Sequence, residues 1–132
     1  MKHWGTRTFE NEVAQSFALA IIAGGEMDSV MRALEIDADD YLDADVAQRA
    51  FVAAEIMAAL MGKPCGDMPP QLRRWVVRQP RPTALTLKKA RRAIKLVAAK
   101  KYADNSELRQ LFEGRLGLWG ASVRDLFGRL KG

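Results

Sequence analysis

The length, composition and charge of the chain favour one folded domain and exclude a disordered protein. Its 132 residues can bury roughly two-thirds of their unfolded surface in one core, and 48% hydrophobic with 28% charged residues is ordinary for a globular protein, so we expect a single helical domain over residues 1–132. The net charge of +5 is unevenly divided, because residues 1–60 hold 4 Lys/Arg and 11 Asp/Glu whereas residues 61–132 hold 17 and 5.

The first half of the chain predicts three helices. Asn11 is a capping residue for a first helix that stops at Gly24-Gly25 and has an apolar stripe of Ala14, Phe17, Ala18, Ile21 and Ile22. Asp28 or Ser29 can cap a short second helix that carries Val30, Met31 and Leu34. A third helix is expected from near Asp43 to the stop at Gly62-Lys63-Pro64, and nearly every face of it is apolar or alanine from Val46 to Met61. Such a helix must be surrounded by others, so we expect it at the centre of the fold.

The second half predicts three more helices. Pro69 and Pro70 suit the first turn of a short helix, which carries Leu72, Trp75 and Val76 and is closed by Pro80 and Pro82. A fifth helix combines the apolar stripe Leu87, Ala90, Ile94 and Val97 with a basic face of Lys88, Arg91, Arg92 and Lys95. Asn105-Ser106-Glu107 can start a last helix, whose stripe favours core packing over a dimerising coiled coil and consists of Phe112, Leu116, Trp119, Val123, Leu126 and Leu130. The predicted fold class is therefore all-α, a single compact bundle of about six helices around a central apolar helix.

Several short motifs along the chain occur in a specific order. They are Trp4-Gly5, Phe9, Asn11, Ala14, Ala54-Glu55, Trp75, Ser106-Glu107-Leu108 and Trp119. In this order they resemble a bacterial family described as domain of unknown function 4259, over nearly the whole chain. Where that family usually has Asp after the Asn, this chain has Glu12, which keeps the charge but lengthens the side chain. The resemblance implies no established activity, although families with similar small bacterial members often include immunity proteins that neutralise toxins.

The chain lacks the patterns of the common catalytic, metal and cofactor sites. His3 and Cys65 are its only histidine and cysteine, too few for a zinc site, and no glycine-rich phosphate-binding motif occurs. The aspartates from Asp37 to Asp45 do not form an EF-hand, because Leu42 and Gln48 stand where that loop needs glycine and glutamate. We predict no catalytic residue, no metal and no cofactor, and we interpret the aspartates as helix caps on a solvated acidic surface.

No segment predicts insertion into a membrane or export. The longest nearly apolar stretch, Ala50 to Gly62, is interrupted by Glu55 and is shorter than the roughly 20 residues of a bilayer span. Glu10 and Glu12 precede the short apolar run from Phe17 to Ala23, which is unlike a signal peptide. We therefore expect a soluble, cytoplasmic protein.

Glu55 is the residue most in need of a partner. Its helix neighbours one turn away are all apolar, namely Phe51, Val52, Ala58 and Ala59, so its carboxylate is expected to be buried. A hydrogen bond or ion pair to the Trp4–Asn11 segment or to a basic residue would stabilise it. We interpret Glu55 as a structural anchor and, with less support, as the centre of a small enzyme.

The basic second half supplies the candidate binding residues. They are Arg73, Arg74, Arg78, Arg81, Lys88, Arg91, Arg92 and Lys95, with Trp4, Asn11, Glu12 and Glu55 as structural or possible site residues. Charge segregation without a catalytic set favours a non-enzymatic protein that binds a protein partner, such as a toxin-immunity or regulatory protein. The alternative is a nucleic-acid-binding module that uses the basic fifth helix.

Overall fold

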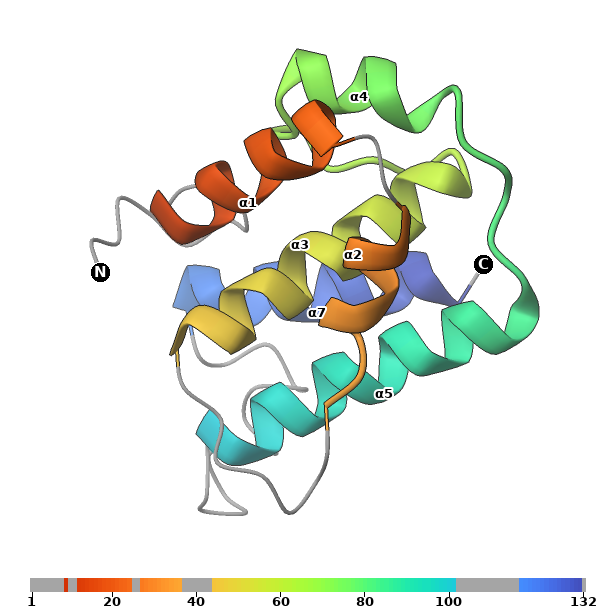
Figure 1. Ribbon diagram of the computed structural model, residues 1–132. Helices are drawn as coiled ribbons and strands as arrows, with labels where there is room; N and C mark the ends of the chain where they lie inside the picture. Colours follow the sequence, from red (N-terminus) through yellow and green to blue (C-terminus); the bar gives the residue numbers. More distant parts are fainter. Residues whose placement is uncertain (1–8, 10–11, 25–26, 37–43, 102–116, 132) are drawn as a thin grey trace.

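The described residues form six helices and no strands, which confirms the predicted fold class. The computed structural model describes residues 9, 12–24, 27–36, 44–101 and 117–131. Its helices are α1 (Glu12–Gly24), α2 (Met27–Ala33), α3 (Ala44–Leu60), α4 (Pro70–Val76), α5 (Ala84–Lys101) and α7 (Gly117–Leu130) (Figure 1). Among the described residues, none of these helices combines the length and the apolar character that a transmembrane span requires.

The third helix is the centre of the bundle, as predicted. It packs against each of the other helices, with α1 and α4 on one side of it and α5 on the opposite side (Figure 1). All nine residues from Ala50 to Ala58 are buried, so the helix is enclosed on every face. Four of them are alanines, whose small side chains let the neighbouring helices approach closely: Ala50, Ala53, Ala54 and Ala58.

The first two helices follow their predicted stripes with small differences. In α1, Ala14, Ala18 and Ile21 are buried, whereas Phe17 and Ile22 are half-buried at the edges of the stripe. The helix α2 begins at Met27, one residue before the predicted cap. Asp28 therefore lies in the first turn of the helix, where its negative charge interacts favourably with the positive end of the helix dipole.

The end of α3 is a glycine turn. Gly62 has a φ of +84°, and its N–H donates to the Ala59 carbonyl at 2.9 Å while the Lys63 N–H donates to the Ala58 carbonyl at 2.9 Å. These two bonds close the helix in the Schellman arrangement. The turn sends the chain away from α3 toward α4 and confirms the predicted stop.

Replacing Gly62 with alanine is expected to lower the free energy of unfolding by about 1 kcal/mol, because a side chain disfavours positive φ. An added Cβ would meet nothing within 4 Å, so the backbone alone is responsible for the cost. Urea unfolding of the variant measures it. The matched control is Gly128→Ala in α7, where an added Cβ also meets nothing and where alanine favours the helix. Equal changes in both variants would contradict the prediction.

The remaining helices bury their predicted apolar residues. Pro69 precedes α4 and Pro70 begins it, and Leu72, Trp75 and Val76 are buried. The whole predicted stripe of α5 is buried: Leu87, Ala90, Ile94 and Val97. In α7, Val123, Leu126 and Leu130 are buried, while Phe112, Leu116 and the predicted start at residues 105–107 lie outside the described residues.

Candidate functional site

Glu55 is buried in α3 on the side that faces α7. Its side chain is only 2% exposed. Arg129 of α7 donates to it twice, from Nη2 to Oε1 at 2.8 Å and from Nη1 to Oε2 at 3.3 Å. Such a double contact is the favoured geometry between an arginine and a carboxylate. The sequence left open which residue would pair with Glu55, and the structure shows that this partner is Arg129, 74 positions away.

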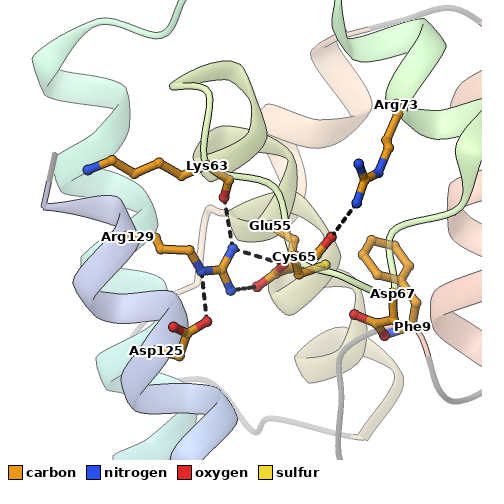
Figure 2. A network of polar contacts seen from close by, with 8 residues as sticks. All are labelled: Phe9, Glu55, Lys63, Cys65, Asp67, Arg73, Asp125 and Arg129. Atoms are coloured by element: carbon orange, nitrogen blue, oxygen red, sulfur yellow. Dashed lines mark hydrogen bonds and ion pairs between the residues drawn. The ribbon is translucent and has the colours of Figure 1, made fainter.

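Arg129 joins three parts of the chain. Besides Glu55, it donates from Nε to Asp125 Oδ2 at 2.8 Å within α7 and from Nη1 to the Lys63 carbonyl at 3.0 Å in the turn after α3 (Figure 2). Burial by itself lowers the pKa of Arg129, but the hydrogen bonds and negative charge of Glu55 and then Asp125 raise that pKa above its ordinary value. Its guanidinium therefore stays charged and holds α7 against the end of α3.

The turn between α3 and α4 is tied down on its other side. Asp67 accepts the backbone N–H of Phe9 at 3.2 Å, and Arg73 donates to the Cys65 carbonyl at 2.9 Å (Figure 2). Burial, and then the negative charges of Glu55 and Asp67, raise the pKa of the Cys65 thiol well above its ordinary value. This thiol stays protonated and is a poor nucleophile.

We expect a thiol reagent to label Cys65 at pH 8 at least about tenfold more slowly in the folded protein than in denaturant, because the thiolate is the reactive form. The pKa of the Cys65 thiol is higher in the folded protein than in the unfolded chain. Its ionisation therefore does not affect the free energy of unfolding below the unfolded pKa of about 8.5, and lowers it as the pH rises above that value. Cys65→Ser should abolish that fall. Equal labelling rates in the folded and unfolded protein would contradict this account.

The chemistry available to Glu55 is limited by its pairing. Both of its oxygens accept hydrogen bonds from Arg129. This arrangement supports a structural role rather than general acid catalysis. Within the described residues there is no cluster of His, Cys, Asp and Glu that could hold a metal ion, and residues 37–43 of the predicted acidic surface lie outside them.

The eight predicted partner-binding residues fall into two groups. Arg73, Arg74 and Arg78 lie on α4 or in the turn after it, and Arg81 follows in the linker. The other four are on α5: Lys88, Arg91, Arg92 and Lys95. Because α4 and α5 lie on opposite sides of α3 (Figure 1), the eight residues do not share one face.

Several of these residues hold the fold together. On α5, Arg91 donates to the Leu130 carbonyl at 2.8 Å and Arg92 donates to the Ile36 carbonyl at 2.8 Å. Lys95 lies 5.6 Å from the centre of the Phe127 ring. By contrast, Arg74, Arg78 and Lys88 are exposed and have no hydrogen-bonding or ionic partner within the part of the chain that the structure describes. Among the eight predicted residues, these two arginines and one lysine are therefore the candidates for contact with a partner.

A shallow apolar hollow of about 570 Å³ lies between the end of α1 and α4. It is lined by Ile22, Gln71, Arg74, Val77 and Arg78, and none of these is acidic. Val77 is 80% exposed, and Leu19 on the outward face of α1 is 59% exposed. Most of that outward face is uncharged: Gln15, Ser16, Leu19, Ala20 and Ala23. We call the exposed residues of α1 from Gln15 to Ala23, together with this hollow, the α1–α4 surface.

Two other hollows, of about 360 and 410 Å³, share Phe17 and Arg49. The first is also lined by Arg32 and Glu35 and the second by Glu12. Each of these two hollows therefore contains side chains of both charges, so neither favours a positively or a negatively charged ligand.

The sequence analysis and the structure differ in which residues they single out. Trp4 and Asn11 lie outside the described residues, and Glu12 is the exposed first residue of α1. Arg129, Leu19 and Val77 were not predicted as site residues. Leu19 had a local signal, because it falls outside the apolar stripe of its helix, but nothing near Arg129 in the sequence indicates its partner.

The fold and the buried ion pair define an all-helical protein built around one enclosed helix, and its motifs allow it to be classified. The chain belongs to the family described as domain of unknown function (DUF4259), whose model matches residues 3–119. This confirms the resemblance seen in the sequence. The match includes Glu55 but ends before Arg129. Searches among curated proteins and among solved structures give no match.

Proposed function

We propose that this protein is a non-enzymatic macromolecule-binding protein whose partner is another protein, as in a toxin-immunity or regulatory protein. The observation that carries the proposal is the α1–α4 surface. Its hollow is lined by exposed Val77 and by two arginines that have no partner in the described part of the chain, and exposed Leu19 lies on α1 one helical turn from Ile22, which also lines the hollow.

The physical reason is the composition of protein interfaces. Their centres are depleted in charge, and arginine is among the side chains that contribute most of the binding energy. Covering exposed apolar side chains removes their surface from water, which favours association. Glu55 and Arg129 are paired with each other inside the fold, so we look for the binding residues on the surface.

The test compares two variants that place the same charge on two different faces. Leu19 on α1 and Leu85 on α5 are 59% and 62% exposed, so Leu19→Glu and Leu85→Glu are matched in chemistry and accessibility. Tagged wild-type protein and both variants are used to capture partners from the source organism, and captured proteins are identified by mass spectrometry. We expect one partner to be retained by wild type and Leu85→Glu and lost with Leu19→Glu.

A partner that is retained equally by both variants would contradict the assignment of the surface. Circular dichroism of each variant separates lost binding from lost folding. If Leu85→Glu loses the partner and Leu19→Glu keeps it, the binding surface is on α5.

Nucleic acid is the second candidate because of one charge pattern. Residues 68–103 contain eleven Lys/Arg and no Asp/Glu, and Lys88 and Lys89 on α5 are exposed. A fluorescent DNA or RNA duplex that binds wild type in a salt-sensitive way, and fails to bind Lys88→Glu with Lys89→Glu, would support it. Arg91 and Arg92 are unsuitable for this test, because they donate hydrogen bonds to Leu130 at the end of α7 and to Ile36 in the segment after α2.

A further inference from the structure

We infer that the α1–α4 surface receives an acidic amphipathic helix of the partner protein. This inference rests on the proposed function and adds the charge and the backbone form of the segment that binds. It follows from three features: the positive charge at the hollow, the lack of Asp and Glu in the surrounding stretch of sequence from residue 68 to residue 103, and the helical backbone of α1 and α4.

The charge at the hollow calls for carboxylates. Arg74 and Arg78 both line it, both are exposed, and neither has a partner within the described residues. No Asp or Glu occurs from residue 68 to residue 103, so this stretch brings no acid of its own to them. Arginine forms paired hydrogen bonds with carboxylates, and a partner with flanking Asp or Glu would satisfy both side chains.

A symmetric dimer that pairs this surface with itself is a poorer way to cover it. Arg74 and Arg78 of one copy would face those of the other, and juxtaposed like charges oppose association. The apolar residues alone would favour such a dimer, but the charges that border them do not. The structure therefore favours a partner of different charge.

The form of the partner segment follows from the backbone. The described residues contain no strand, so they present no sheet edge to which an extended peptide could add. The hollow is lined by no aromatic side chain, which a proline-rich segment would require. A helix fits this surface because it can turn apolar side chains toward Ile22 and Val77, and toward Leu19 one turn from Ile22, while its acidic flank reaches Arg74 and Arg78.

The experiment uses designed peptides of about 18 residues, or five helical turns, with leucines on one face. The test peptide has glutamates on both flanks of that face, the second has lysines there, and the third keeps the glutamates but has alanines in place of the leucines. Binding of each labelled peptide to the full-length protein is measured by fluorescence anisotropy at about 50 mM and about 500 mM salt, which differ strongly in charge screening. We expect the glutamate peptide to bind and the other two to bind at least about tenfold more weakly.

Two matched double variants locate the site. Arg74→Glu with Arg78→Glu and Lys88→Glu with Lys89→Glu make the same change in net charge on opposite sides of α3. We expect the Arg74/Arg78 double variant, and Leu19→Glu, to weaken binding of the glutamate peptide at least about tenfold. The Lys88/Lys89 double variant should weaken its binding less than about threefold. Circular dichroism and sedimentation of each variant report folding and oligomeric state.

Other outcomes would overturn the inference. These are equal binding of the lysine or alanine peptide, no binding of the glutamate peptide, an equal effect of both double variants, or a wild-type dimer that Leu19→Glu dissociates. If the peptide results fail while Leu19→Glu still loses a captured protein partner, the proposed function stands and only the acidic helix is wrong. If neither experiment depends on Leu19, both are wrong.

Discussion

Replacing Arg129 with methionine is expected to lower the free energy of unfolding by about 3 kcal/mol, because it leaves the Glu55 carboxylate buried without its countercharge. Glu55 is 2% exposed and Arg129 is 16% exposed at the side chain, so solvent offers little compensation to the carboxylate. The variant also loses the hydrogen bond to the Lys63 carbonyl at the end of α3. Urea unfolding followed by circular dichroism measures the change.

Two controls make the Arg129 result specific. Arg124→Met removes an exposed arginine from the same helix and should change stability by less than about 0.5 kcal/mol. Adding Glu55→Leu to Arg129→Met should restore much of the loss, because an apolar pair no longer contains a buried unpaired charge. If Arg129→Met costs no more than Arg124→Met, the ion pair does not anchor α7.

The helices were predictable because their signals are local. Capping residues, glycine stops and apolar spacing lie within a few positions of one another, and α3 is apolar on all its faces within a single stretch. The start of α2 was predicted too late, because Met27 is itself helical and both predicted caps, Asp28 and Ser29, lie inside the helix. Boundaries of this kind depend on contacts that single residues do not show.

The candidate site was less predictable because it depends on contacts between distant residues. Burial of Glu55 follows from its helix neighbours, but its partner Arg129 comes from a helix beyond the family match. Helical spacing predicted one basic face for Lys88, Arg91, Arg92 and Lys95, but it cannot show that Arg91 and Arg92 reach carbonyls of two different segments. The sequence alone does not distinguish an exposed arginine from one that holds two segments together.

The separation of the basic residues has the same origin. Their sequence density suggests one patch, but the linker from Val77 to Thr83 carries the chain past α3, so α4 and α5 end on opposite sides of it (Figure 1). Net charge therefore overstates the basic surface that any single partner meets. The proposed binding therefore depends less on the total charge than on Arg74 and Arg78, which line an apolar hollow and have no partner among the described residues.

Replacing Ile56 with alanine is expected to destabilise the protein by about 3 to 4 kcal/mol, because the cavity left in a closely packed core adds to the lost burial. Ile56 is fully buried in the part of α3 that is enclosed on every face, so no helix can move in without displacing another. Leu85→Ala, at a side chain 62% exposed on α5, should change stability by less than about 0.5 kcal/mol. Urea unfolding of both variants checks the difference, and similar losses would mean that α3 is not the centre of the folded core.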